Sequence, residues 1–128
     1  MQRGLSLLLR REVEVMGAGR TDSGVHARTM VAHFDNPEAI DANQLCYRLN
    51  RVMPTDIAIN SIYPVDEEMH ARFSATNRTY RYFVHTKRDP FCRDYSVEMH
   101  YPINFELMNE AAKMLLDAED FKAFCKSN

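Results

Sequence analysis

Residues 17–27 have the sequence GAGRTDSGVHA, and they lie between two stretches with the side-chain pattern of β-strands. Charged and apolar side chains alternate over residues 12–16, as in a strand that is buried on one face. Apolar side chains over residues 25–34 predict a second strand, which ends at Asn36-Pro37. The glycine-rich segment is therefore expected to form a loop where one strand gives way to the next.

This loop matches neither of two common phosphate-binding motifs. The dinucleotide fingerprint needs a different glycine spacing and a following helix, and a Walker A loop needs Gly-Lys-Ser/Thr. What remains is Arg20 and Asp22, two residues apart in an irregular loop, where both side chains can face one cleft. A carboxylate in such a loop is typical of a nucleophile, a general base, a metal ligand or a turn-forming residue, and these alternatives stay open.

The rest of the chain predicts three helices and two further strands. Helices are expected over residues 2–11, over residues 42–52 after the N-cap Asp41, and after the N-cap Asn104. Strands are expected over residues 57–63 and 78–86. The order α-β-β-α-β-β-α predicts an α+β fold with a largely antiparallel sheet and helices packed on one face.

Length and composition exclude several classes of protein. The chain has 128 residues, of which 45% are hydrophobic and 27% charged, as in one ordinary globular domain. It has no run of about 20 apolar residues that could cross a membrane, and no signal peptide. Three cysteines without a C-x-x-C pair predict a reducing, cytoplasmic location, and five histidines without ligand spacing predict no metal site.

The charge is unevenly distributed along the chain. Residues 72–93 hold six basic side chains and one acidic side chain, which gives +5 against a total of −2, so the remainder carries −7. Such a basic segment favours an anionic partner such as RNA, with a solvated strand as the alternative. The helix over residues 2–11 has no N-cap candidate before it, and Phe121, Phe124 and Cys125 form an apolar cluster at the other end, so the chain is expected to be cut at both ends.

Five blocks of sequence together resemble the tRNA pseudouridine synthases of the TruA type. Gly19–Ala27 resembles the signature loop of that family, and four further blocks follow in the family's order. These are Leu49–Ile57, His70–Ala75, Arg78–Tyr82 and Asp120–Phe124. The resemblance implies a partial pseudouridine synthase catalytic domain, because family members are about twice as long. Residues 1–88 would be most of the N-terminal half without its first strand, and residues 89–128 the start of the C-terminal half.

The resemblance also implies an activity. Family members isomerise uridine to pseudouridine in the anticodon arm of tRNA, as homodimers and without cofactor or metal. A catalytically inactive fragment that binds RNA or takes part in assembly is the alternative. The family's nucleophile falls on Asp22, and the loop arginine falls on Arg20, which is expected to pair with Asp22 in the empty site and with phosphate when RNA is bound.

Other site residues follow from the same resemblance. The active-site tyrosine falls on Tyr80, whose ring is expected to stack on the target base. Arg78 and Arg81 are expected to contact phosphate, together with Lys87 and Arg88. The remaining motif positions are expected to support these loops: Gly19, Thr21, Gly24, His26, Arg72, Phe73 and Ser74. Gly17, Gly19 and Gly24 are predicted to supply backbone angles that other residues resist.

Overall fold

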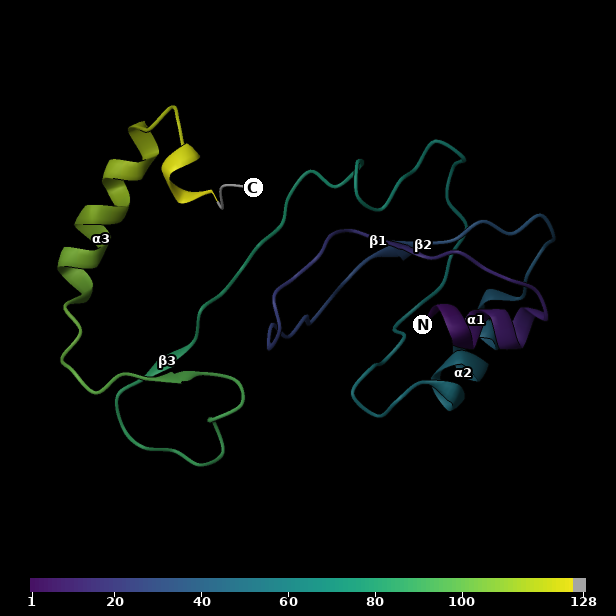
Figure 1. Cartoon of the computed structure of the whole chain (residues 1–128), viewed down its shortest axis with the longest axis horizontal. Helices are drawn as coiled ribbons and strands as arrows, with labels where there is room; N and C mark the ends of the chain where they lie inside the picture. Colours follow the sequence, from purple (N-terminus) through teal and green to yellow (C-terminus); the bar gives the residue numbers. More distant parts are fainter. Residues whose placement is uncertain (126–128) are drawn as a thin grey trace. The chain divides into compact units, whose positions relative to one another are not determined.

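The computed structural model describes residues 1–125 and divides into two compact units. The first unit runs from Met1 to Thr79 and contains α1 (Gln2–Leu9), β1 (Met16–Gly17), β2 (Ala32–His33) and α2 (Ala42–Val52) (Figure 1). The second begins at Tyr80 and contains β3 (Val84–His85), β4 (Val97–Glu98) and α3 (Phe105–Met114). Two short 3-10 helices follow α3, η1 (Leu115–Asp117) and η2 (Lys122–Phe124).

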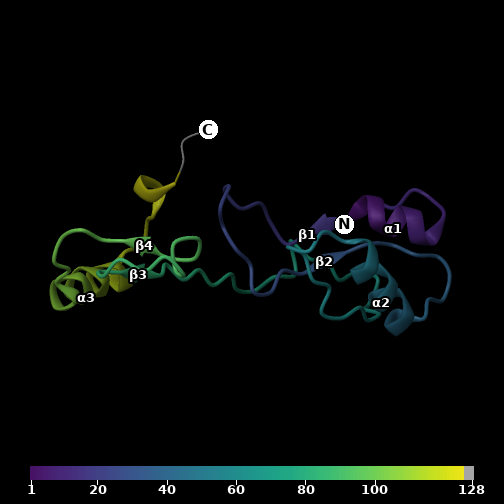
Figure 2. The same ribbon diagram turned by 90° about the horizontal axis from the view of Figure 1, so that it is seen from below.

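The first unit has a core between its two helices, which lie side by side in Figures 1 and 2. Leu5 of α1 and Leu45 and Leu49 of α2 are buried there together with Val13. Each fully buried leucine contributes about 1.5–3 kcal/mol relative to an exposed one. Gly4 lets the helices approach, because a Cβ at that position would lie 3.1 Å from Leu49 Cδ1 and closer still to Met53 Cε.

The bounds of α2 agree with the prediction over residues 42–52. Asp41 caps the helix, with its Oδ1 accepting a hydrogen bond from the Gln44 N–H at 2.9 Å. The Met53 N–H closes the last turn on the Leu49 carbonyl at 3.0 Å, and Pro54 follows. The helix predicted over residues 2–11 ends earlier, because Arg10 adopts a left-handed φ of 55°.

The predicted α+β class is confirmed, but the predicted sheet is wrong. Within residues 1–125 there are two separate two-stranded sheets in place of one large antiparallel sheet covered by helices. Strands β1 and β2 pair antiparallel, with Met16 opposite His33, whereas β3 and β4 pair parallel, with Val84 opposite Val97. The strands predicted over 12–16, 25–34 and 78–86 shrink to β1, β2 and β3, and β4 was not predicted.

Side chains take the hydrogen bonds that strand partners would have supplied. The predicted strand over residues 57–63 lies along α2, where Asn50 Oδ1 accepts from the Ile59 N–H and Asn50 Nδ2 donates to the Ile59 carbonyl, both at 2.8 Å. In the predicted strand over 12–16, the Val13 N–H donates to Ser6 Oγ at 3.1 Å. Alternation of side chains predicted strands in both segments, but these backbone groups bond to side chains and form no strand there.

The second unit is held by a short ladder and a capped helix. The Val97 N–H donates to the Phe83 carbonyl at 2.9 Å, and the Met99 N–H donates to the His85 carbonyl at 2.8 Å. Asn104 caps α3 as predicted, with its Oδ1 accepting from the Leu107 N–H at 3.0 Å. Within residues 1–125, no helix combines the length and apolar character that crossing a membrane requires.

Candidate active site

The loop over residues 18–31 projects from the β1–β2 pair on the side away from α1 and α2 (Figures 1 and 2). The Ala18 N–H donates to the Val31 carbonyl at 2.9 Å, which extends the ladder by one bond at the root of the loop. Residues 19–31 are all exposed. The loop is therefore fixed at its base and open to solvent beyond it.

Asp22 is the first residue of a turn over residues 22–25 within this loop. The Val25 N–H donates to the Asp22 carbonyl at 3.3 Å, and Gly24 has a φ of 83° in the third position of the turn. That left-handed angle favours glycine. The predicted unusual angles of Gly17 and Gly19 are wrong, since Gly24 is the only glycine of positive φ in residues 1–125. Arg20, Thr21, Asp22 and His26 are all exposed.

The motif that begins at His70 forms a closed turn. Ser74 Oγ accepts from the His70 N–H at 3.0 Å, and the Ser74 N–H donates to the His70 carbonyl at 2.9 Å. His70 Nδ1 accepts from the N–H groups of Arg72 and Phe73 at 3.1 and 3.2 Å. A ring nitrogen that accepts carries no proton, so this geometry assigns the tautomer protonated at Nε2.

His33 of β2 ties this turn to the strand pair. Its Nδ1 accepts from the Ala71 N–H at 3.1 Å, and its ring packs edge-on against the His70 ring with centroids 4.5 Å apart. Phe73 stacks on the His70 ring with centroids 4.4 Å apart, and the Arg72 guanidinium lies 5.7 Å from the Phe73 centroid. His33 was not singled out from the sequence, because a lone histidine in a strand carries no motif.

Arg78 connects the glycine-rich loop to the turn. Its Nη2 donates to the Ala18 carbonyl at 3.0 Å and to the Arg72 carbonyl at 2.7 Å. Its Nε lies 3.7 Å from where a Cβ on Gly19 would be. The structure thus brings together the loop that carries Asp22, the turn with Arg72, Phe73 and Ser74, and Arg78.

Tyr80 and Arg81 open the second unit. The side chains of Tyr80 and Tyr82 are 67% and 88% exposed, so both rings are accessible for stacking. Lys87 and Arg88 are exposed at the start of the β3–β4 connection. The predicted base-stacking and phosphate-binding side chains of this unit are therefore all accessible to a ligand.

Asp89 organises the β3–β4 connection. Its Oδ1 accepts from the Phe91 N–H at 2.9 Å and its Oδ2 accepts from Cys92 Sγ at 3.3 Å. These two bonds lower the pKa of the Asp89 carboxyl, and the bond to Asp89 raises the pKa of the Cys92 thiol. Cys92 therefore holds its proton and is unsuited to act as a nucleophile.

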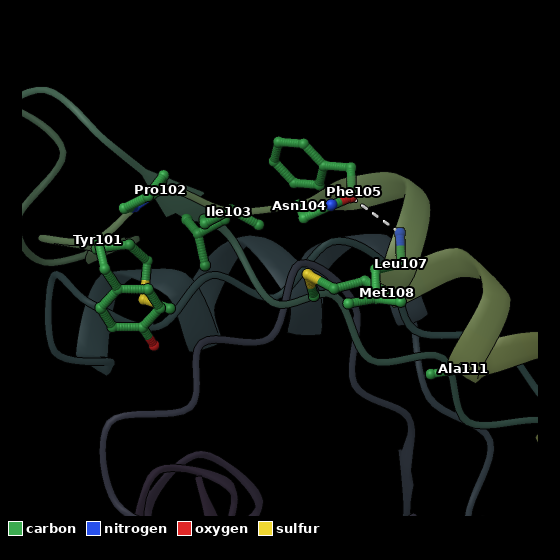
Figure 3. Close-up of a pocket in the computed structure, with 10 residues that line it drawn as sticks. Tyr101, Pro102, Ile103, Asn104, Phe105, Leu107, Met108 and Ala111 are labelled. Carbon is green, nitrogen blue, oxygen red and sulfur yellow. Dashed lines mark hydrogen bonds between the residues drawn. The ribbon is translucent and has the colours of Figure 1, made fainter.

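Two hollows are lined by other residues than those of the candidate site, one in each unit. One, of about 440 Å³, lies in the second unit at the start of α3, lined by apolar side chains such as Tyr101, Ile103 and Met108 (Figure 3). The other, of about 420 Å³, lies in the first unit beside Arg11 and Asn36. Neither includes a predicted site residue, so the candidate site is an exposed surface.

The part of the chain that the structure describes contains no group of three or more His, Cys, Asp or Glu side chains suited to hold a metal ion. A carboxylate, guanidinium groups, hydroxyls and aromatic rings are the types that provide nucleophilic attack, phosphate binding and base stacking.

Several bacterial proteins with the name tRNA pseudouridine synthase A are similar to this chain. That of Parabacteroides distasonis is 50% identical over 127 residues, which cover 98% of this chain and 50% of the relative. That of Bacteroides thetaiotaomicron is 47% identical over 126 residues, which cover 98% and 47%. That of Bacillus subtilis is 46% identical over 115 residues, which cover 88% and 47%. No protein-family model matches the sequence.

These matches show that the chain is a relative of the pseudouridine synthases. More particularly, it is related to the tRNA pseudouridine synthase A proteins, and the resemblance to the TruA type that its motifs predicted is confirmed. The chain spans about half the length of the curated relatives it matches.

Proposed function

We propose that this chain is the part of a tRNA pseudouridine synthase that carries the catalytic loop, isomerising uridine to pseudouridine in the anticodon arm of tRNA. The observation that supports this most is the 50% identity to a tRNA pseudouridine synthase A over 98% of the chain, a match that extends across the loop with Asp22. The proposal extends the function in the relative's name to this chain because the chain contains the segment that resembles the family's signature.

In the proposed reaction, the bond between ribose C1′ and uracil N1 breaks, the base rotates, and a bond forms between C1′ and C5. N1 gains a proton, and C5 loses the one it carried. Asp22 is the nucleophile, which splits one difficult step into easier ones. Its place at the start of an exposed turn gives the carboxylate access to a nucleotide that has left its stack. No cofactor or metal takes part.

The neighbouring side chains bind the RNA. Arg20 lies two residues before Asp22 and is exposed, so its planar guanidinium can grip a phosphate. Tyr80 stacks on the target base with its accessible ring. Arg81, Lys87 and Arg88 contact phosphates, and the steep salt dependence of such contacts is their signature.

We further propose the organisation of the protein. Residues 1–88 correspond to most of the N-terminal half of the pseudouridine synthase catalytic domain, and residues 89–128 begin its C-terminal half; residues 126–128 lie outside the described residues. The match of the chain to about half of each relative supports this. The protein acts in the cytoplasm as a homodimer, as the resemblance to the family implies.

A second function is favoured by the same coverage. A chain that spans half of its relatives and keeps exposed basic and aromatic side chains can bind RNA or take part in assembly without catalysis. Binding of tRNA that weakens steeply with salt, without turnover, would be its mark. The two functions differ in the chemical step alone.

The test is release of tritium from tRNA labelled at uridine C5. The wild-type chain should release tritium, and Asp22→Asn should reduce release by more than about 10³-fold, the scale of losing a catalytic carboxylate or nucleophile, while tRNA affinity is kept. Asp35→Asn, which removes another exposed carboxylate of the first unit, is the matched control and should keep activity. Full activity of Asp22→Asn would contradict the nucleophile assignment. Salt-dependent binding without release from any chain would favour the second function.

A further inference from the structure

Arg78 belongs to the basic segment that the sequence predicts to face RNA, but its guanidinium is already engaged. A guanidinium carries five donors in a rigid plane and has no acceptor, so it can donate to two carbonyl groups at once. The Nη2 of Arg78 does this, at 3.0 Å from the Ala18 oxygen and 2.7 Å from the Arg72 oxygen.

One carbonyl lies at the root of the loop and the other lies within the turn that follows His70. Ala18 is the root of the loop, where its own N–H bonds to Val31, and Arg20 follows two residues later. Arg72 is the middle of the turn that His70 and Ser74 close. Hydrogen bonds from a charged donor are stronger than neutral ones, so Arg78 adds a direct link between these two segments to the one that runs through His33 of β2.

Arg81, three residues later, gives a contrast. Among residues 1–125 its side chain has no hydrogen bond or ion pair, so its charge is available to a ligand. To bind a phosphate through Nη2, Arg78 would have to break its hydrogen bonds to the Ala18 and Arg72 carbonyls. The two arginines of one basic segment therefore differ in the groups that their guanidinium donors already bind.

We propose that Arg78 is a positioning residue. It holds the loop that carries Arg20 and Asp22 in a fixed place beside the His70–Ser74 turn, and it acts on the reaction through that loop and not by binding tRNA phosphate. The role rests on the proposed function, in which Asp22 is the nucleophile. Small displacements of a catalytic group lower turnover steeply, so the loss of such a clamp is felt in kcat.

The test compares Arg78→Gln and Arg78→Lys with Arg81→Gln in the full chain. Amide hydrogen exchange should become several-fold faster over residues 18–31 in both Arg78 variants, with α2 unchanged. The salt slope of tRNA binding should stay unchanged in Arg78→Gln and fall by about 0.9 in Arg81→Gln, the contribution of one phosphate contact. Lysine keeps the charge but not the planar fork, so it should not restore protection of the loop. If the chain turns over tRNA, kcat of both Arg78 variants should fall by about 10²-fold while KM stays unchanged.

The opposite pattern overturns the proposal. If Arg78→Gln lowers the salt slope by about 0.9, Arg78→Lys restores it, and exchange in the loop is unchanged, then Arg78 is a phosphate contact. Faster exchange of α2 together with the loop in both variants would make Arg78 a general stabiliser and would also overturn the proposal. A wild-type chain that releases no tritium contradicts the proposed function alone, because loop exchange still decides the role of Arg78.

Discussion

The two units of the chain handle their apolar side chains in opposite ways. In the first unit, Leu5, Val13, Leu45 and Leu49 are each no more than 5% exposed. In the second, no described residue from Tyr80 onward is buried, and Leu116 remains 84% exposed. Both units contain a capped amphipathic helix, so the helical pattern alone does not account for the difference.

The difference is a matter of partners. α1 and α2 face each other across Gly4, and each covers the apolar stripe of the other. In its own unit, α3 contacts η1, which continues directly from it, and the one leucine of α3, Leu107, remains 62% exposed. An amphipathic pattern therefore predicts where a helix forms and which face is apolar, but burial depends on a second element with a matching face.

The loop that carries Asp22 belongs to the unit that has the core. The loop with Asp22 is exposed, yet its root is bonded to β2 through Val31 and to Arg78. Reactive groups are positioned most accurately when they are held by a rigid scaffold. We therefore expect the placement of Asp22 to depend on packing in the first unit.

The largest expected effect comes from the core. Leu49→Ala removes a side chain that is 1% exposed and leaves a cavity, so the free energy of unfolding of the first unit should fall by about 2–5 kcal/mol. Leu116→Ala, the matched change at an 84% exposed position, should alter the free energy of unfolding of the second unit by less than about 0.5 kcal/mol. Urea unfolding followed by circular dichroism measures both. Equal losses for the two variants would break the comparison between the units.

A smaller effect separates the two helix caps. Asp41→Ala and Asn104→Ala each remove a side chain that accepts one N–H, which costs about 1 kcal/mol of helix stability. Because α2 carries Leu45 and Leu49, the loss at Asp41 should lower the stability of the whole first unit. The loss at Asn104 should fray the start of α3 alone.

Hydrogen exchange distinguishes these two results. In Asp41→Ala, protection should fall together in α1 and α2, and in Asn104→Ala only in α3. Asn43→Ala, an exposed change inside α2 that touches no cap, serves as the control for altered helix propensity. Loss confined to the first turn of α2 in Asp41→Ala would show that this helix is not cooperative with the core.

Local patterns could be predicted from the sequence, and distant pairings could not. Asp41 and Asn104 marked their helices correctly, because a cap and the amide it binds lie three residues apart. The strand over 57–63 was predicted wrongly, because its backbone bonds go to the Asn50 side chain. The alternation of side chains along a segment carries no information about such a bond.

The same holds for the candidate site. Asp22 and Arg20 could be singled out because they lie in one glycine-rich segment that resembles a family signature. The contacts of Arg78 with Ala18, 60 residues earlier, and of His33 with Ala71, 38 residues later, join segments far apart in the chain. Their geometry needs the folded backbone, so the sequence could suggest that Arg78 matters but not what it binds.

The smallest expected effect concerns the β3–β4 connection. Hydrogen bonds order this connection, whereas buried apolar side chains order the first unit. The Cys92 thiol donates to Asp89, which raises the pKa of the thiol and lowers the pKa of the carboxyl. The bond therefore contributes stability near neutral pH. That stability is lost as the pH rises through the raised pKa of Cys92, and also as it falls through the lowered pKa of Asp89.

Alkylation of the thiol tests this sign. Asp89→Asn removes the charge that holds the proton on Cys92, so the pKa of the thiol should fall and alkylation at mildly alkaline pH should become faster. Cys46 in the first unit donates to the Ile59 carbonyl at 3.3 Å and should react at the same rate in both proteins. Mass spectrometry after a timed reaction measures the two cysteines in one sample. A slower reaction of Cys92 in Asp89→Asn would mean that Asp89 keeps the connection open, and that local hydrogen bonds do not order the second unit as the core orders the first.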